Sequence, residues 1–343
     1  MNFDLDESQT LVRSTIERFC APMDVTTRLA VRRGVGAMDR ERWAELAGLG
    51  LIALAANEAD GGLGGSLIDC ALVAEALGRG QAVDPWLECG FLAVRLLAGT
   101  SHIGGVIDGS VLAAFAFAEP NRRFQMDAAG VRLNHGRLSG EKRLVLCGAV
   151  ANLFIVTARD GEETRLFAVP GDAPGVYRKA YPVADGSLAA VITLRDVAVT
   201  EALPAAIDVA VDAARLMIAA EIAGLARRLF DDTLAYAKSR EQFGQPIGRF
   251  QVIQHRMVDA YAKVEQMQSA VYGALLQPGV PPAAIKAFVA EQALWVAEQA
   301  VQVHGGMGVT NDIGIGHGLK RILLLSKLFG DPATDIAAFA QAA

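Results

Sequence analysis

Apolar residues recur at helical spacing over the first third of the chain. One face of the first predicted helix collects Leu5, Gln9, Val12, Ile16 and Phe19. The same spacing returns in segments centred on 40–49, 66–79 and 85–99. A glycine-rich break at 61–65 interrupts it, and Ser66 is placed to cap the next helix. We therefore predict a helical domain over residues 1–110.

The pattern changes to short β-type runs in the middle of the chain. Alternating or β-branched stretches, separated by Gly, Asp and Pro clusters, lie at 111–118, 131–138, 152–158, 165–169 and 189–194. Such runs with turn signals between them are typical of an antiparallel sheet or barrel. We assign this middle domain to residues 111–203.

The last part of the chain returns to helical patterning after Leu203-Pro204. Residues rich in Ala, Leu, Glu, Gln, Lys and Arg form four long segments at 206–238, 249–276, 282–302 and 312–328. Their number and short connections predict a four-helix bundle over residues 204–343. The whole chain is then an α+β protein with helical, sheet and helical parts in that order.

Composition narrows the class of protein. With 343 residues, 52% of them hydrophobic and 20% charged, the chain can bury a large core. Mean hydropathy is +0.30, yet charges interrupt every long apolar run, so we expect no membrane span. The first residues are acidic and lack an apolar signal core, which favours a cytoplasmic location.

Charge and cysteine spacing argue against two further classes. A net charge of -6 without a concentrated basic face does not suit a nucleic-acid-binding protein. Cys20, Cys70, Cys89 and Cys147 are too widely scattered for a zinc site or a C-x-x-C redox pair. We expect buried thiols and no metal site.

Two segments place polar side chains and glycines at breaks between predicted helices, at 239–251 and 302–308. The Arg240 guanidinium can donate two parallel hydrogen bonds to phosphate oxygens, and Gly305 and Gly306 let backbone N–H groups approach a ligand. A plainer interpretation makes Arg240 a solvated cation at a helix end and the glycines a turn between helices.

Motifs along the whole chain resemble the acyl-CoA dehydrogenase family. They occur in the family's order and spacing at 43–51, 57–66, 75–79, 138–142, 240–244 and 302–306. The resemblance implies an amino-terminal helical domain, a middle β domain and a carboxy-terminal four-helix bundle. It also implies FAD as cofactor and an acyl-CoA thioester as substrate.

The resemblance assigns cofactor contacts residue by residue. Arg240 and Gln251 would contact the flavin dinucleotide, and Phe243 would pack against it. The adenosine diphosphate end would meet the loop formed by Gln302, Val303, His304, Gly305 and Gly306. Because these contacts reach a cofactor whose ring rests on the neighbouring subunit, the resemblance implies an oligomer.

The chain departs from the family on the side of the flavin ring. Of a Thr-Glu-Pro-x-x-Gly-Ser-Asp segment only Glu119-Pro120 survives, and a shielding tryptophan and a hydrogen-bonding threonine are replaced by Leu144 and Leu146. The two family positions for the glutamate base match Phe329 and Ala214, which cannot accept a proton.

Three carboxylates could substitute for the missing base. They are Asp312 after the di-glycine loop, and Glu221 or Asp212 on the first bundle helix. Asp312 is more simply interpreted as a helix N-cap.

The chain thus keeps the residues that would reach a neighbour's dinucleotide and lacks those that would hold the flavin ring and perform the chemistry. Three hypotheses follow from this difference. The chain resembles the smaller subunit of bacterial heterotetrameric acyl-CoA dehydrogenases, completing a larger homologous subunit's flavin site and passing electrons to an electron-transferring flavoprotein. It is alternatively a self-sufficient dehydrogenase with a displaced carboxylate, or a flavin-free scaffold or regulatory homologue. Heteromeric relatives act on steroid side-chain thioesters, and small residues at 219–224 could make room for such a group or simply let helices pack.

Overall fold

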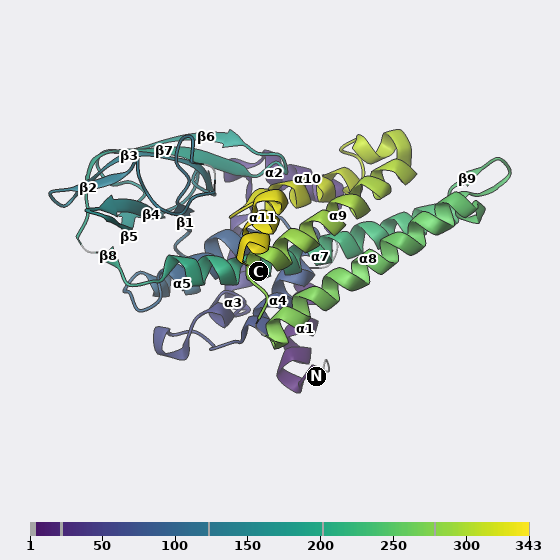
Figure 1. Ribbon diagram of the computed structural model, residues 1–343, viewed down its shortest axis with the longest axis horizontal. Coiled ribbons are helices and arrows are strands. Elements are labelled where there is room, and N and C mark those ends of the chain that lie inside the picture. Colours follow the sequence, from purple (N-terminus) through teal and green to yellow (C-terminus); the bar gives the residue numbers. More distant parts are fainter. Residues whose placement is uncertain (1–4, 21–22, 123, 201, 278, 343) are drawn as a thin grey trace. The chain divides into compact units, whose positions relative to one another are not determined.

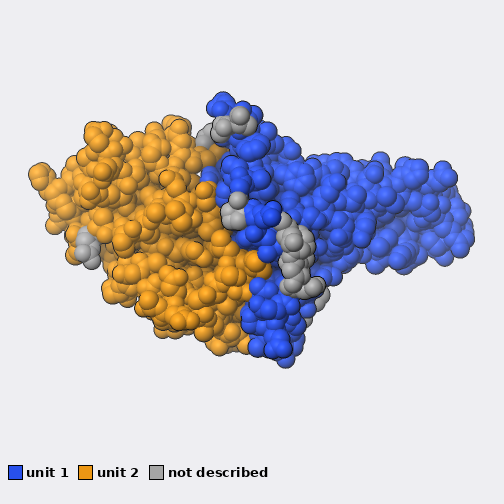
Figure 2. Space-filling model, turned by 60° about the horizontal axis from the view of Figure 1, so that its bottom comes forward, with its two compact units in different colours: residues 1–29, 71–82, 215–343 blue, residues 30–70, 83–214 orange. Residues whose placement is uncertain are grey.

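A computed structural model describes residues 5–20, 23–122, 124–200, 202–277 and 279–342. The chain forms two compact units, coloured separately in Figure 2. Unit 1 comprises Met1–Leu29, Ala71–Ala82 and Arg215–Ala343. Unit 2 comprises Ala30–Cys70 and Val83–Ala214. The predicted order of helical, sheet and helical parts is confirmed (Figure 1), while the boundaries at 110 and 203 stay predictions.

The first third of the chain is helical, as predicted. Its α-helices are α1 (Glu7–Phe19), α2 (Val25–Arg33), α3 (Arg40–Gly48), α4 (Leu67–Arg79), α5 (Leu92–Leu96) and α6 (Ile103–Ile107). Short 3-10 turns η1 (Val35–Ala37), η2 (Ala53–Ala55) and η3 (Glu58–Asp60) and a π-helix, η4 (Trp86–Phe91), connect them.

Local hydrogen bonds explain where two of these helices begin. Asp6 accepts the Gln9 amide at 2.8 Å while Gln9 accepts the Asp6 amide, which makes a capping box for α1. Ser66 and Asp69 do the same for α4: the Asp69 amide donates to Ser66 Oγ and the Ser66 amide donates to Asp69 Oδ2. The predicted cap at Ser66 is therefore confirmed.

The sheet of unit 2 has the strand order β6-β7-β3-β2-β4-β5-β8, with β1 paired to β4. The strands are β1 (Ala113–Ala116), β2 (Arg132–Asn134), β3 (Arg137–Leu146), β4 (Leu153–Asp160), β5 (Glu163–Pro170), β6 (Val176–Pro182), β7 (Leu188–Ala198) and β8 (Ala202–Leu203). The sheet is mixed rather than antiparallel throughout, because β1 and β2 both run parallel to β4. The antiparallel prediction was wrong on this detail.

β3 and β6 lie largely outside the predicted β-type runs, for physical reasons. β3 carries charges and two register shifts along its pairing with β7, with Gly140 and Leu144 at positive φ, so its alternation is broken. β6 is an edge strand whose side chains are mostly exposed, so it has no buried face to produce alternation. The core of unit 2 contains Phe154, Val156, Phe167 and Ile192, all almost fully buried, and β3 still contributes Leu138 and Val145 to it.

The carboxy-terminal helices are α7 (Ile207–Ser239), α8 (Gln251–Leu276), α9 (Pro282–His304), α10 (Gly314–Lys327) and α11 (Pro332–Ala342). Between them lie strands β9 (Glu241–Gln242) and β10 (Gln245–Pro246) and the 3-10 turns η5 (Ile247–Arg249) and η6 (Gly305–Val309). α9 packs against α8, α10 and α11. The four predicted helices are present, and α11 adds a fifth.

Within unit 1, α4 and α7 approach each other at two glycines. A Cβ on Gly224 would come within 2.0 Å of the Glu75 carbonyl oxygen, and one on Gly78 within 2.1 Å of the Glu221 carbonyl oxygen. Gly224 is therefore explained by close helix packing. No helix in the described part of the chain is long and apolar enough to cross a bilayer.

Candidate functional site

A β-hairpin formed by β9 and β10 lies at the far end of α7 and α8 (Figure 1), and Phe243 lies in its turn. Gln242 pairs with Gln245, and Phe243 and Gly244 between them have φ of 55° and 79°. Two consecutive positive φ values define a turn that normally selects Asn-Gly or Gly-Gly. Phe243 occupies it with its side chain 91% exposed, so neither backbone preference nor burial within this chain explains the phenylalanine.

Arg240 and Gln251 flank this hairpin. Arg240 follows the end of α7, and its carbonyl oxygen accepts the Ile247 amide at 2.8 Å, which closes the base of the loop. The Arg240 side chain is exposed and makes no ion pair or hydrogen bond with the described residues. Gln251 is the exposed first residue of α8, a helix whose N-cap, Phe250, supplies no side-chain hydrogen bond. A free guanidinium and an uncapped helix start favour an anionic ligand.

The predicted di-glycine loop ends α9. Gly305 has φ 64° and ψ -140°, a conformation that favours glycine, and its N–H donates to the carbonyl oxygens of Val301 and Gln302. A Cβ added to Gly305 or Gly306 would meet no atom within 4 Å. Packing within the chain therefore does not require glycine at 306, and both glycine backbones are open to an external group. Gln302 is exposed and Val303 is half-buried.

The hairpin and the di-glycine loop share one end of unit 1. The His304 ring stacks on the Tyr236 ring of α7 with centroids 4.3 Å apart, and His304 Nδ1 lies 2.8 Å from the Ala300 carbonyl oxygen. Arg256 Nη1 of α8 donates to Gln299 Oε1 of α9. These contacts place the end of α7, the start of α8 and the end of α9 near one another, and the role of the predicted cofactor residues stays a prediction. A guanidinium, amides and open glycine backbone form a donor set that fits the phosphates of FAD.

The two family positions for the base hold residues with other contacts. Ala214 is fully buried, and Phe329 is 3% exposed with φ 59°. The Phe329 carbonyl oxygen accepts Arg215 Nη2 at 2.7 Å and Nε at 3.1 Å. Buried Lys286 donates to the carbonyl oxygen of Gly330 at 2.9 Å. Two cations therefore fix the backbone of this corner, and no side chain at either position can accept a proton.

The substitute carboxylates lie in different settings. Glu221 is buried and receives Arg321 Nε at 2.7 Å and Nη2 at 3.3 Å, so its two oxygens are engaged. Asp312 is exposed before α10, whose actual N-cap, Ile313, makes no side-chain cap, so the simpler interpretation of Asp312 as N-cap was wrong. α10, about 21 Å long at 1.5 Å per residue for its 14 residues, lies between Asp312 and Phe329 in the chain. A catalytic role for Asp312 or Glu221 stays a prediction.

In unit 2, the surviving Glu119 and Lys142 form a buried cage. The Glu119 carboxylate accepts the amides of 129–131 at 2.6–3.0 Å and Lys142 Nζ at 2.8 Å. Lys142 also donates to Thr157 Oγ1 at 2.7 Å and to the Phe117 carbonyl oxygen at 3.1 Å. Burial opposes ionisation of Glu119, but Lys142 and the amides outweigh it and lower the pKa to about 2. Burial lowers the pKa of Lys142 to about 8, against the opposing effect of Glu119.

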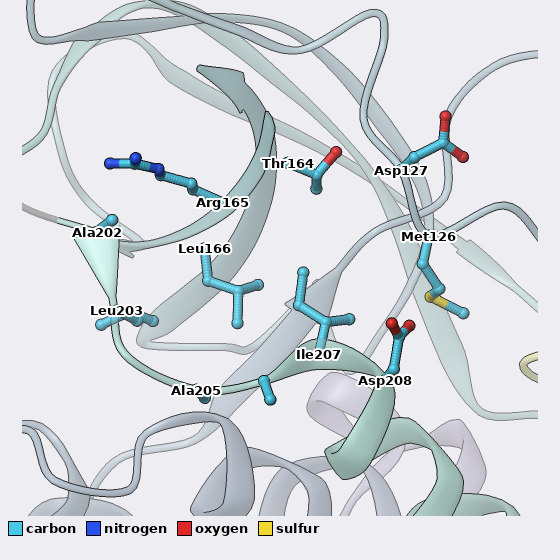
Figure 3. Close-up of a pocket in the computed structure, with 11 residues that line it drawn as sticks. Met126, Asp127, Thr164, Arg165, Leu166, Ala202, Leu203, Ala205, Ile207 and Asp208 are labelled. Carbon is cyan, nitrogen blue, oxygen red and sulfur yellow. The ribbon is translucent and has the colours of Figure 1, made fainter. Parts of the chain in front are cut away.

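A cavity of about 560 Å³ lies in unit 2 beside residues 126 and 127. Its lining is mixed: Figure 3 shows apolar Met126, Leu166 and Ile207 together with the carboxylates of Asp127 and Asp208. The start of α7 forms part of its wall.

Sequence reasoning missed the residues that support these positions. Arg215, Lys286 and Tyr236 were not singled out, although each acts on a predicted site residue or its backbone. Lysine within an otherwise apolar run of α9 is the signal that could have identified Lys286, since an unpaired lysine is rarely buried. Arg215 and Tyr236 offered no comparable signal.

The chain is similar to known proteins in both sequence and structure. Residues 6–98 match the family model for the acyl-CoA dehydrogenase N-terminal domain, and residues 205–342 match that for the acyl-CoA dehydrogenase C-terminal domain. Acyl-CoA dehydrogenase IpdE2 of Mycolicibacterium smegmatis is 31% identical over 342 residues, covering 97% of each chain.

Two solved structures are similar over nearly the whole chain. A variant of the steroid ACAD Tcur3481-Tcur3483 has a TM-score of 0.89 at 28% identity, covering 98% of this chain and 97% of that one. The ChsE4-ChsE5 complex from Mycobacterium tuberculosis has a TM-score of 0.85 at 25% identity, covering 99% and 98%.

Proposed function

The chain belongs to the acyl-CoA dehydrogenase family, and on that premise we propose that it serves flavin-dependent α,β-dehydrogenation of an acyl-CoA thioester as the subunit without a base. The chemistry that FAD supplies in this reaction is acceptance of a hydride from the β-carbon. A carboxylate must take the α-proton. In our proposal that carboxylate belongs to a larger homologous subunit.

The residues of this chain hold the dinucleotide in the proposed assembly. Arg240 donates to phosphate oxygens, Gln251 and the start of α8 offer further donors, and the backbone of 305–306 comes close to the adenosine diphosphate end. Phe243 packs against the cofactor. The single observation that carries the proposal is that the Arg240 side chain is exposed and makes no ion pair or hydrogen bond with the described residues, while Phe243 and Gly306 are exposed as well.

The residues at the family's base positions, and the carboxylates that could replace the base, also support a subunit that carries no base of its own. Phe329 and Ala214 occupy the base positions, and Glu221 is committed to Arg321. Asp312 lies beyond the opposite end of α10 from Phe329. These contacts do not favour a self-sufficient enzyme, and the exposed Arg240 does not favour a flavin-free scaffold.

Similar proteins support the choice of partner and substrate class. The ChsE4-ChsE5 structure is a complex of two named chains, and the Tcur3481-Tcur3483 protein is a steroid ACAD. We therefore propose a mixed assembly that acts on the CoA thioester of a steroid side chain. The cavity beside residues 126 and 127 would take the amide-bearing arm of CoA, and an electron-transferring flavoprotein would reoxidise the flavin.

Flavin content distinguishes these possibilities. The chain is purified alone and co-expressed with the larger subunit, and flavin absorbance and native mass are measured for both. We expect a mixed assembly that contains FAD and is active on acyl-CoA, and little flavin on the chain alone. A homogeneous preparation of this chain with one FAD per protomer and acyl-CoA dehydrogenase activity would refute the proposal.

Arg240→Ala tests the cofactor contact within the mixed assembly. Loss of charge-assisted hydrogen bonds worth about 1.5–3 kcal/mol should weaken FAD binding roughly ten- to hundredfold. Arg18→Ala, which removes an exposed arginine at the end of α1, is the matched control and should leave binding unchanged. Equal FAD affinity in the two variants would contradict the assignment of Arg240.

A further inference from the structure

A stacked ring pair connects the hairpin end of α7 with the di-glycine loop. The ring centroids of Tyr236 in α7 and His304 in α9 lie 4.3 Å apart, with 22° between the ring planes. Tyr236 precedes Arg240 by one helical turn, and His304 directly precedes Gly305. Among the described residues, no hydrogen bond or ion pair joins 236–250 to 302–309. The ring pair is therefore the specific contact between these two segments.

Hydrogen bonds fix the backbone beside Tyr236 and the ring of His304. The Tyr236 carbonyl oxygen accepts the Arg240 amide at 2.8 Å where α7 ends. His304 Nδ1 lies 2.8 Å from the Ala300 carbonyl oxygen, and because a carbonyl oxygen only accepts, Nδ1 carries the hydrogen. His304 is buried and Tyr236 is half-buried. The two rings therefore meet in one defined arrangement.

The hairpin is fixed to the same end of α7. The Ile247 amide donates to the Arg240 carbonyl oxygen at 2.8 Å, and Gln254 Nε2 donates to the Gly248 carbonyl oxygen at 3.1 Å. A Cβ on Gly248 would come within 2.9 Å of the Ala237 carbonyl oxygen, so η5 lies directly on the last turns of α7. A shift of this end of α7 relative to α9 would therefore move the hairpin relative to the di-glycine loop.

We propose that Tyr236 is a positioning residue for FAD, which acts through His304 to hold the di-glycine loop in the place that the dinucleotide requires. This inference rests on the proposed function, in which Arg240 and the backbone of 305–306 bind one and the same dinucleotide. Charge-assisted hydrogen bonds need well-placed donors, so the two segments must keep a fixed separation. Without the ring contact they would sample other separations, and FAD binding would have to order them.

The ring of Tyr236, rather than its hydroxyl group, makes this contact. The hydroxyl group forms no hydrogen bond with the described residues, whereas offset stacked rings attract each other through their faces. Tyr236→Phe should therefore preserve the arrangement, and Tyr236→Leu should not. This difference separates a role of the ring from a role of the hydroxyl group.

FAD affinity of the mixed assembly tests the proposal. Tyr236→Phe should keep the affinity within about twofold, whereas Tyr236→Leu should weaken it about three- to tenfold. Tyr261→Leu is the matched control: it removes a tyrosine of α8 whose ring lies 5.9 Å from the Phe230 ring of α7, outside the proposed site, and should leave the affinity unchanged. His304→Leu should reproduce the effect of Tyr236→Leu, which keeps the test valid where one variant fails to fold.

A double-mutant cycle separates positioning from a purely structural role. Arg240→Ala should weaken FAD binding less in the Tyr236→Leu background than in the wild type, because Arg240 and the loop no longer hold one cofactor together. A purely structural role would instead lower the thermal midpoint of the FAD-free assembly and leave the effect of Arg240→Ala on affinity unchanged. That additive result would overturn the inference.

Two further outcomes would contradict the role of Tyr236. One is equal FAD affinity in Tyr236→Leu and Tyr261→Leu. The other is a loss in Tyr236→Phe as large as that in Tyr236→Leu, since the hydroxyl group would then carry the effect. If Arg240→Ala still weakens FAD binding, only the inference about Tyr236 fails. If Arg240→Ala leaves FAD affinity unchanged as well, the cofactor assignment in the proposed function fails with it.

Discussion

At the scale of single residues, the buried contacts of Glu119 and Lys142 explain why these two family residues are present although much of the surrounding family pattern is replaced. Each makes several buried hydrogen bonds inside unit 2, so its loss would leave the other charge uncompensated. Leu144 and Leu146 make no comparable polar network with their side chains. Resemblance alone could not separate these two groups, because burial and hydrogen-bond partners become visible only in the fold.

Glu119→Gln should lower the free energy of unfolding by about 3–5 kcal/mol, because it leaves the Lys142 ammonium buried without its counterion. Urea unfolding measures the change. Glu141→Gln is the matched control: it breaks an ion pair with Arg143 that is substantially exposed, and the cost should stay below about 1 kcal/mol.

The stability difference between wild type and Glu119→Gln should depend on pH. Because the fold lowers the pKa of Glu119 to about 2 from 4.5, its ionisation stabilises the native state above about pH 4.5. That contribution is lost as the pH falls towards 2. The stability difference between wild type and Glu119→Gln should therefore shrink over this range, and a constant difference would contradict the proposed cage.

Phe243 offers a second residue-scale prediction, in which stability and binding change in opposite directions. Asn tolerates positive φ better than Phe and precedes glycine in the preferred two-residue turn, so Phe243→Asn should raise stability by up to about 1 kcal/mol. The same change should reduce FAD retention by the mixed assembly. Thermal unfolding and flavin absorbance measure the two effects, and a loss of both stability and flavin would indicate a structural role instead.

At the scale of elements, periodicity predicted the long helices and failed at irregular strands. Helices α7 to α10 have buried faces and strong helix formers, so their patterns survive in the sequence. β3 and β6 have bulges or exposed side chains, and β1 and β2 run parallel to β4 through pairings distant in the chain. Strand direction depends on such pairings, and a local pattern does not contain them.

Two glycine-to-alanine substitutions test how closely the elements pack. Their expected effects on stability have opposite signs. Gly224→Ala should destabilise unit 1 by about 1–3 kcal/mol or more, because its methyl group would collide with the backbone of α4. Gly273→Ala on α8 meets no atom within 4 Å and should stabilise the helix by up to about 1 kcal/mol. Chemical denaturation of both variants provides the comparison, and equal effects would refute the close approach at Gly224.

At the scale of the whole molecule, the sequence indicated where the candidate site lies better than it indicated which residues perform the chemistry. Residues 240–251 and 302–306 carry recognisable side chains at helix breaks, and the fold brings them to one end of unit 1. Whether Glu221 is a base or an ion-pair partner depends on Arg321, 100 positions away.

The discontinuous make-up of unit 1 also affects synthesis of the protein. Once residue 214 has been translated, all of unit 2 exists, yet the apolar face of α4 still lacks most of α7 and every later helix of its own unit. The remaining 129 residues, from 343 less 214, require roughly 6–26 s at about 5–20 residues per second. During that interval the apolar face of the nascent α4 is not yet covered by the later helices of its own unit.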